Sequence, residues 1–259
     1  MHPAPSGMTR AERQFLKSLH QKKNRYRYRT LLIEGEKLIC EAIDAHYPLE
    51  KVYYSDHISD STYTLLQSLQ QKKAVSHADI EVVSTHKNPE GVIATTVLPD
   101  SVLPNPFPEI TTAIYLWQIN DPGNLGAILR TAAWFGINHV FLSPDSVDPY
   151  SPKVIRGSMG AIFRLGIWQH IPPEKIESIV LKQGLELLAA DMSGTPPDNL
   201  DLDRWLLVLG NESHGLPKFI IKKSAATIGV QRFGFGESLN LSVSAGIIIH
   251  ELYRIKRSV

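Results

Sequence analysis

The sequence has one cysteine in 259 residues, Cys40. A single cysteine excludes an intramolecular disulfide framework and argues against a metal cluster held by cysteine. Cys40 lies in the helical pattern of residues 37–43, where a small buried hydrophobic side chain is a far commoner role than a nucleophile. We therefore expect no metal site and a protein of the reducing cytoplasm.

Long apolar runs are also lacking. No stretch approaches the roughly 18 apolar residues of a membrane-spanning helix, so we expect no membrane partner. The hydrophobic share of 43% and the charged share of 20% are those of an ordinary globular protein. A chain of 259 residues is long enough for one large domain or for two of modest size.

Acidic residues are scarce near the N-terminus, although the net charge of the whole chain is only +1. Residues 10–29 contain one acid, Glu12, and Tyr26 and Tyr28 alternate with arginines there. This mixture suits contacts with phosphates and stacking on exposed bases, while a solvated helix end explains the charge run equally well. The basic residues of the run are Arg10, Arg13, Lys17, Lys22, Lys23, Arg25, Arg27 and Arg29.

Prolines divide the chain into two parts. Pro99, Pro104, Pro106 and Pro108 fall within ten residues, and proline removes backbone donors and favours extended structure. We therefore place a semi-rigid linker at residues 99–110. The remaining segments are an N-terminal extension with a basic helix at 1–22, a small domain at 23–98 and a larger domain at 111–259.

Strand and helix patterns alternate on both sides of the linker, which indicates two α/β folds. In the small domain and its extension we expect strands at 30–34, 51–54, 80–83 and 91–97, and helices at 9–21, 35–45 and 63–72. In the large domain we expect a mostly parallel sheet with strands at 112–117, 140–142, 185–190, 205–209 and 227–230. Its helices are expected at 125–135, 151–159, 216–224 and 239–256.

Three loops of the large domain follow strand ends, which is where open parallel sheets place ligands. The loop at 120–126 is neither a GxGxxG sequence nor a P-loop, so nucleotide binding of those kinds is poorly supported. Arg130 follows it in an otherwise almost wholly apolar helix, where an unpaired charge is costly. Two interpretations have equal weight: an ion pair with Asp121 or Glu212, and a cation directed at a phosphate or a developing oxyanion.

The other two loops also carry polar residues. Two polar side chains, Asn211 and Glu212, come directly after a buried strand, which favours a site over a helix-dipole role for Glu212. No second ligand stands at metal spacing from His214. In the last loop, Ser238 is expected to cap a helix that starts at Leu239. Asn240 lies in the expected first turn, where better helix formers would serve stability, so a capped turn and a functional site are about equally supported.

Read together, these loops resemble the three signature motifs of the SpoU (TrmH-like) family, the RNA ribose 2′-O-methyltransferases of the SPOUT superfamily. The resemblance lies in residues 120–132 (NDPGNLGAILRTA), 209–216 (LGNESHGL) and 237–245 (ESLNLSVSA), in family order. Residues 152–165 are also similar to the family. Residues 32–37 and 88–94 resemble the ribosomal-protein-like RNA-binding domain that often accompanies it.

The resemblance implies an α/β SPOUT domain with a deep C-terminal trefoil knot, a rare exception to the rule that chains do not thread loops. It also implies S-adenosylmethionine as cofactor, no metal, and a homodimer with sites at the interface. Backbone contacts to the cofactor would come from Gly210, Val230 and Leu239. The family's conserved polar positions match Asn124, Arg130, Glu212, Ser238 and Asn240. RNA contacts are expected from Arg25, Arg27, Arg29, Lys37, Lys153 and Arg156, although Lys153 and Arg156 could equally be solvated helix residues.

The resemblance also suggests roles. The methyl sulfonium is already a strong electrophile, so the enzyme must position it and help to remove the ribose 2′-hydroxyl proton. Arg130 is the family's candidate for this step, but the high pKa of arginine makes it a better phosphate anchor and oxyanion stabiliser than a base. Ser238 and Asn240 would orient Arg130 or the ribose, and Glu212 would hold Asn124 or Arg130.

Large-subunit rRNA is the expected substrate. The alternatives are a tRNA methyltransferase and a catalytically silent RNA-binding or ribosome-assembly factor. One departure concerns the cofactor: the family commonly has a Pro-Met pair after the last strand, and Gln231 and Arg232 stand there instead.

Overall fold

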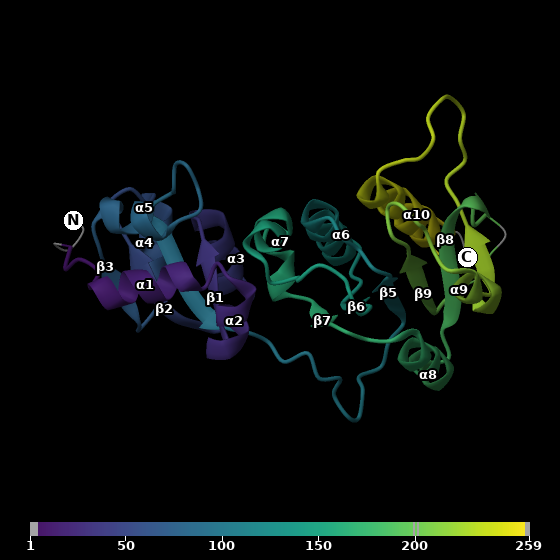
Figure 1. Cartoon of the computed structure of the whole chain (residues 1–259), viewed down its shortest axis with the longest axis horizontal. Coiled ribbons are helices and arrows are strands. Elements are labelled where there is room, and N and C mark those ends of the chain that lie inside the picture. The colour runs from purple at the N-terminus through teal and green to yellow at the C-terminus, as the bar shows by residue number, and fades with distance from the viewer. Residues whose placement is uncertain (1–4, 199, 201, 257–259) are drawn as a thin grey trace. The chain divides into compact units, whose positions relative to one another are not determined.

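The computed structural model describes residues 5–198, 200 and 202–256. The chain forms two compact units (Figure 1). The first comprises Met1–Asp100 and Tyr150–Phe163, and the second comprises Ser101–Pro149 and Arg164–Val259. The break at position 100 falls in the proline-rich stretch, while residues 150–163 pack with the first unit. The domain boundaries proposed from the sequence remain a prediction.

The first unit is built on a four-stranded sheet with the order β1-β4-β2-β3. Strand β4 pairs antiparallel with β1 and β2, and β2 pairs parallel with β3. The whole of β1 and all but the last residue of β4 are buried, so the core of this unit lies on both sides of these strands. The strands are β1 (Thr30–Glu34), β2 (Leu49–Tyr54), β3 (Lys72–Ala74) and β4 (Val92–Val97).

Helices of the first unit begin at polar caps that the sequence supplies. Thr9 forms a reciprocal capping box with Glu12, and the hydroxyls of Ser59, Ser76 and Ser151 each accept an amide of the following turn. The helices are α1 (Arg10–Ser18), α2 (Lys22–Tyr28), α3 (Glu36–Asp44), α4 (Asp60–Leu66), α5 (His77–Val83) and α7 (Pro152–Gly157), with a 3₁₀ turn at Ala161–Phe163.

Three sequence-based expectations for this unit are wrong. The helix expected at 63–72 is α4, which ends at Leu66, and Lys72 begins strand β3. The single helix expected at 9–21 ends at Ser18, and α2 starts separately at Lys22. The strand expected at 80–83 is the second half of helix α5, because Ser76 caps a turn there and Ile80 and Val83 face the core one helical turn apart. The third strand is instead β3, whose short sequence is only partly buried.

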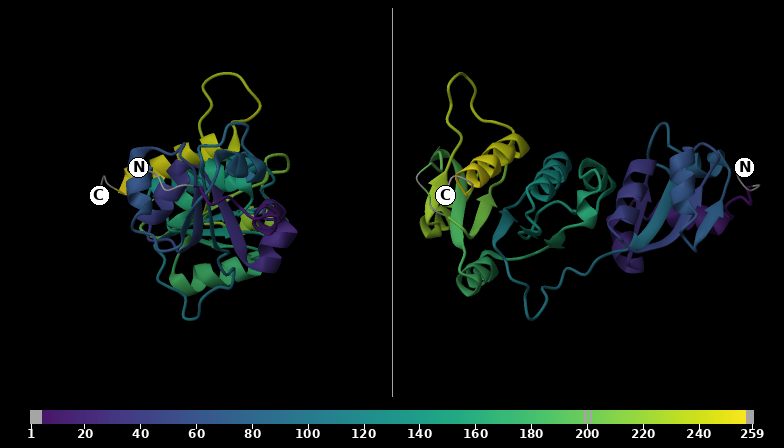
Figure 2. Two further views of the ribbon diagram at one scale, coloured as in Figure 1. Left: turned by 90° about the vertical axis from the view of Figure 1, so that its left-hand side faces the viewer. Right: turned by 180° about the vertical axis from the view of Figure 1, so that it is seen from behind.

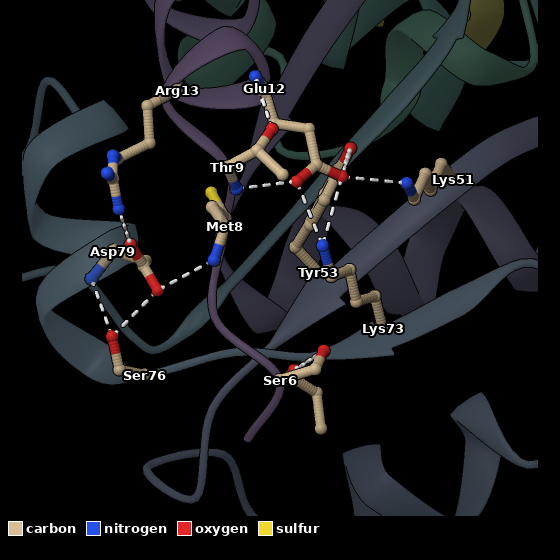
Figure 3. Close-up of polar contacts among 11 residues, drawn as sticks. Ser6, Met8, Thr9, Glu12, Arg13, Lys51, Tyr53, Lys73, Ser76 and Asp79 are labelled. Carbon is tan, nitrogen blue, oxygen red and sulfur yellow. Dashed lines mark hydrogen bonds and ion pairs between the residues drawn. The ribbon is translucent and has the colours of Figure 1, made fainter.

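Two carboxylates fasten the N-terminal helix, Glu12 to the sheet and Asp79 to helix α5 (Figure 3). Glu12 accepts hydrogen bonds from Lys73 Nζ at 2.9 Å and Lys51 Nζ at 3.0 Å, and Asp79 accepts from Arg13 and from the Met8 amide. Burial raises the pKa of Glu12, but hydrogen bonds from Lys73, the Thr9 amide and Lys51 outweigh it and hold that pKa well below its usual range. Glu12 is therefore ionised, and its carboxylate is bound by the two lysines of the sheet.

The second unit contains a six-stranded sheet with the order β10-β8-β9-β5-β6-β7, and every neighbouring pair is parallel. The central strands β5 and β9 are buried along their whole length, as expected for a parallel sheet covered on both faces. The strands are β5 (Thr112–Leu116), β6 (His139–Leu142), β7 (Gly166–Trp168), β8 (Glu186–Thr195), β9 (Trp205–Leu209) and β10 (Ala226–Ile228). The expectation of an α/β fold with a mostly parallel sheet is confirmed.

Helices α6 (Pro122–Trp134) and α10 (Leu241–Lys256) lie side by side in the second unit (Figures 1 and 2). Their first residues meet at a hydrogen bond between Asn124 and Asn240, and near their ends the ring of Phe135 lies 5.4 Å from that of Tyr253. The two helices therefore run parallel. The unit also contains α8 (Pro173–Gln183) and α9 (Lys218–Lys223), and α8 and β7 have no counterpart among the expected elements.

The start of the last helix corrects another expectation. Helix α10 begins at Leu241, not Leu239, and its cap is Asn240. The side-chain oxygen of Asn240 accepts the amides of Ser242 at 2.9 Å and Val243 at 3.3 Å. Ser238 lies two residues before the cap, in an exposed loop. Among the described residues, no helix has both the length and the apolarity needed to cross a membrane.

The imidazole ring of His139 packs against the aromatic rings of Phe107 and Trp168 in the second unit. Its ring stacks on that of Trp168 at 5.4 Å, and its Nδ1 is buried without a hydrogen-bond partner among the described residues. Burial lowers the pKa of His139. Below the ordinary value of 6.5 the unfolded chain therefore takes up a proton that the folded protein resists, and stability falls as the pH falls.

We expect His139→Phe to flatten the loss of stability between pH 6.5 and the lowered folded pKa, because the replacement removes the titrating group. Chemical denaturation followed by tryptophan fluorescence measures this unit, since Trp117, Trp134, Trp168 and Trp205 all lie in it. His170→Phe, at an exposed histidine of the same unit, is the control and should keep the wild-type pH dependence. Equal pH profiles for His139→Phe and wild type would contradict the expectation.

Candidate active site

Three loops leave the carboxyl edge of the parallel sheet in the second unit. They follow β5, β9 and β10, and β5 and β9 are neighbours in the sheet. Residues 117–121 lead from β5 into α6, residues 210–217 lead from β9 into α9, and residues 229–240 lead from β10 into α10. Parallel strands end at one edge, so loops far apart in the sequence meet there.

Asn124 joins all three loops. It lies in the first turn of α6, where Asp121 caps the helix by accepting the Asn124 amide at 2.8 Å. The buried side chain of Asn124 donates to Glu212 Oε1 at 3.0 Å and accepts from Asn240 Nδ2 at 2.9 Å. An amide can donate and accept at once, which neither a carboxylate nor an ammonium group can do. The site is therefore assembled around the Glu212–Asn124–Asn240 chain of hydrogen bonds.

The loop after β9 is closed tightly on itself. A Cβ atom on Gly210 would lie 2.6 Å from the carbonyl carbon of Gly215, so only glycine fits there. Asn211 is buried, donates to the Gln118 carbonyl at 2.7 Å, and accepts the amides of Ser213 and His214. Asn211 was not among the expected site residues, although it is one of the two polar side chains that follow the buried strand.

The loop after β10 contributes only its last residue to the hydrogen-bonded chain. Residues 231–240 are exposed, including Ser238 and Leu239, and Val230 is half-buried. The loop projects from the unit between β10 and α10 (Figures 1 and 2). The structure thus brings Asn124, Glu212 and Asn240 together, whereas Ser238 forms no hydrogen bond with any of these three residues.

Arg130 lies on the exposed side of α6, two turns after its start. Its guanidinium forms no hydrogen bond or ion pair with any described residue. The first interpretation of Arg130, a pair with Asp121 or Glu212, is therefore wrong in this structure, because Glu212 is bound by Asn124 instead. The second interpretation, a cation available to an anion, agrees with its position.

Arg25 does not fit the expected contact with RNA. Its side chain is only 3% exposed, and Nη1 donates to the carbonyls of Leu19 and His20 at 3.0 and 2.8 Å. These are unpaired carbonyls at the end of α1, so Arg25 caps that helix and helps to set the break before α2. Its role is structural, and the charge run in the sequence could not reveal this.

The other expected RNA contacts are exposed cations of the first unit. Arg27, Lys153 and Arg156 are exposed, Arg29 pairs with Asp100, and Lys37 pairs with Glu41 at 2.6 Å. Surface pairs of this kind contribute little and exchange readily for a phosphate. Within the described part of the chain, no group of three or more metal-ligating side chains comes together.

A parallel sheet with glycine- and amide-rich loops at its carboxyl edge defines an α/β enzyme that binds a small ligand there. Comparison with known proteins identifies the class. The family model of the SpoU rRNA methylase family matches residues 111–250. The model of the MRM3-like substrate binding domain matches residues 14–94.

Individual relatives agree with these matches. An uncharacterised tRNA/rRNA methyltransferase of Synechocystis sp. is 30% identical over 249 residues, covering 92% of this chain and 89% of the relative. The 23S rRNA (guanosine(2553)-2′-O)-methyltransferase RlmP of Bacillus subtilis is 26% identical over 239 residues, covering 91% and 93%. The AdoMet-bound structure of an rRNA methyltransferase from Sinorhizobium meliloti superposes with a TM-score of 0.83 at 26% identity, covering 96% of each chain.

The chain belongs to the SpoU rRNA methylase family and carries an N-terminal substrate-binding domain. The resemblance drawn from the three loops is thereby confirmed, as is the expectation of an RNA methyltransferase of the kind that uses S-adenosylmethionine.

The Glu212–Asn124–Asn240 hydrogen bonds can be tested by removing the donor at position 124 and then placing a donor at position 212. Asn124→Asp would place a carboxylate against that of Glu212 and should lower the free energy of unfolding by about 1–2 kcal/mol. Adding Glu212→Gln restores a donor opposite the new acceptor and should recover most of the loss. Denaturation followed by tryptophan fluorescence measures both. Glu212→Gln alone is the control and should cost little, and a double variant no more stable than Asn124→Asp would contradict the arrangement.

Proposed function

We propose that this protein transfers a methyl group from S-adenosylmethionine to a ribose 2′-hydroxyl of ribosomal RNA. The observation that carries the proposal is the Glu212–Asn124–Asn240 chain, which fixes the three family motifs at one corner of the sheet. The Bacillus subtilis relative RlmP, a 23S rRNA 2′-O-methyltransferase, supports this substrate. The chain's place in the cytoplasm, where ribosomes are made, is part of the proposal.

The residues at this corner suit the cofactor. Gly210, half-buried Val230 and exposed Leu239 offer backbone groups and apolar surface, and the side-chain groups nearby are mainly neutral amides. Such a set suits an adenine and a zwitterionic amino acid, which need backbone hydrogen bonds and apolar contact. S-adenosylmethionine, when bound, supplies an electrophilic methyl group. The AdoMet-bound structure from Sinorhizobium meliloti supports the choice.

The remaining polar residues act on the RNA. Arg130 has a free guanidinium and would anchor a phosphate and stabilise negative charge that develops on the 2′-oxygen. Asn240 is held by Asn124 and by its role as a cap, so its position is set before RNA binds. Ser238, two residues earlier, would orient the ribose. The exposed cations Arg27, Arg29, Lys37, Lys153 and Arg156 would bind phosphates along the substrate.

A trefoil knot of the kind typical of this family is also proposed, with residues 229–256 as the knotted segment. The close approach of this segment to the end of β8, at the irregular end of the β8–β10 pairing, supports it. A Cβ atom on Gly229 would lie 2.6 Å from the Gly194 carbonyl oxygen, and one on Gly194 would lie 2.5 Å from the Ile228 carbonyl carbon. Side chains at either position would hold these two segments apart. Glycine at both positions lets the C-terminal segment pass close to the end of β8.

A homodimer completes the proposal. Helices α6 and α10 expose Trp134 (85%), Val243 (50%) and Ile247 (38%) on the same helix pair as Arg130. Apolar side chains of this size are commonly covered by a partner. A second copy placed against α6 and α10 would cover them and bring Arg130 to the interface, close to the active site.

We expect the wild-type protein to transfer tritiated methyl groups to ribosomal RNA, and Arg130→Ala to lower the rate on the order of a hundredfold, because an anchored cation is lost. Parallel reactions with bulk tRNA distinguish the alternative substrate. Arg130→Lys should retain part of the rate, and Lys182→Ala on α8 serves as a surface control. No transfer to either RNA by a protein that binds the cofactor would favour a silent RNA-binding factor.

We expect Val243→Glu to convert the dimer into a monomer at micromolar concentration, because a charge would be buried at the interface. Light scattering after size-exclusion chromatography measures the mass. Leu181→Glu, at an equally aliphatic and more exposed position on α8, is the matched control and should remain dimeric. A monomeric wild-type protein would contradict this arrangement.

A further inference from the structure

Helices α1 and α2 form a surface with uncompensated positive charge, referred to below as the α1–α2 surface. Five of its cations are exposed and form no ion pair with a described residue. The nearby acids do not neutralise them, because Glu12 is bound by Lys51 and Lys73 and Asp79 is bound by Arg13 (Figure 3). The five cations are Arg10, Lys17, Lys22, Lys23 and Arg27.

Two aromatic rings lie open on the same surface. Phe15 of α1 is 38% exposed and Tyr28 of α2 is 44% exposed. Their rings meet edge-on, with centroids 5.4 Å apart and an interplanar angle of 70°. The guanidinium carbon of Arg27 lies 5.4 Å from the Tyr28 ring centroid, and the Tyr28 hydroxyl has no hydrogen-bond partner among the described residues.

The backbone fixes where Tyr28 stands. It is the last residue of α2, because Arg29 takes the left-handed conformation with φ 54° and ends the helix. Arg25, buried beneath the helix, holds the start of α2 against the end of α1. The aromatic pair is therefore mounted on a fixed helix junction. It is not carried by a mobile loop.

The exposed cations and aromatic rings of this surface indicate which kind of ligand it binds. Exposed cations attract a polyanion, and an open aromatic pair beside a guanidinium stacks on flat, unsaturated rings. A nucleic acid with unpaired nucleotides offers both phosphates and accessible base faces, since bases within a duplex are covered by their neighbours, and the proposed function makes that nucleic acid RNA. We propose that the α1–α2 surface binds an unpaired nucleotide of the RNA substrate, with its base on Tyr28 and Phe15 and its phosphates on Arg27 and the nearby lysines. The proposal rests on the proposed function for the identity of the RNA as substrate.

Binding of the full-length protein to a fluorescein-labelled 12-nucleotide single-stranded RNA tests this surface, with the same sequence in a perfect duplex for comparison. We expect Tyr28→Ala to weaken binding of the single strand about tenfold, because one base loses its stacking partner. Tyr28→Phe should retain wild-type affinity. Phe15→Ala provides a second variant of the same pair, and circular dichroism melting verifies that each variant is folded.

The salt dependence of RNA binding distinguishes the contribution of base stacking from that of phosphate contacts. Tyr28→Ala should leave the slope of log affinity against log salt unchanged, whereas Lys22→Gln and Lys23→Gln should each reduce it by about 0.7. Phe219→Ala in the second unit is the matched control: its ring is 43% exposed and meets Trp117 edge-on at 6.0 Å. This control should bind RNA as the wild type does.

Unchanged affinity in Tyr28→Ala and Phe15→Ala, or an equal loss in Phe219→Ala, would overturn the proposal. A change in the oligomeric state of the RNA-free protein without a change in RNA affinity would overturn it as well and assign the rings to a protein contact. Methyl transfer by the same samples keeps the two proposals apart. Transfer with unaltered affinity rejects the stacking surface alone, and weakened binding without transfer in any sample rejects the enzymatic function alone.

Discussion

One buried amide holds the candidate active site together. Asn124 binds Glu212, 88 positions away in the sequence, and Asn240, 116 positions away, and each bond uses a different half of its side chain. Because a buried polar group that loses its partner costs free energy, the two loops and the start of α6 are stable only in this mutual arrangement. The positions of the loop that starts at Gly210 and of the cap at Asn240 follow from it.

The parallel sheet makes this arrangement possible. Its central strands β5 and β9 end side by side, so the loops that carry Asn124 and Glu212 start as neighbours. Glycine at 210 then lets one loop fold back on itself, and glycine at 194 and 229 lets the last segment approach the end of β8. The hydrogen bonds of Asn124 at the sheet edge thus depend on close backbone packing at these three glycines, where a larger side chain would not fit.

Much of this was visible in the sequence, and the failures have physical causes. The buried strands were predictable because long apolar runs bounded by polar loops leave few alternatives. The run Ile80–Val83 was too short to distinguish a strand from a helix, and the cap at Ser76 decided for the helix. Ser238 and Asn240 are both good caps, and only the amides that Asn240 accepts from Ser242 and Val243 show which is used. Arg25 binds carbonyls only five and six positions away, but it does so because α1 ends there, and the charge run does not show that end. The bond from Asn211 to Gln118, 93 positions away, depends on the fold of the sheet.

Helices α6 and α10 run parallel, and this orientation has an electrostatic consequence. Each helix has a positive end at its first turn, and here both first turns meet at Asn124 and Asn240. A negative charge at such an end is stabilised by about 0.3–1 kcal/mol per helix. The Glu212 side chain, bound by Asn124, lies beside these helix starts, and an incoming anionic ligand would meet the same field. The dipoles of α6 and α10 thus favour negatively charged groups at the edge of the sheet where the two helices start.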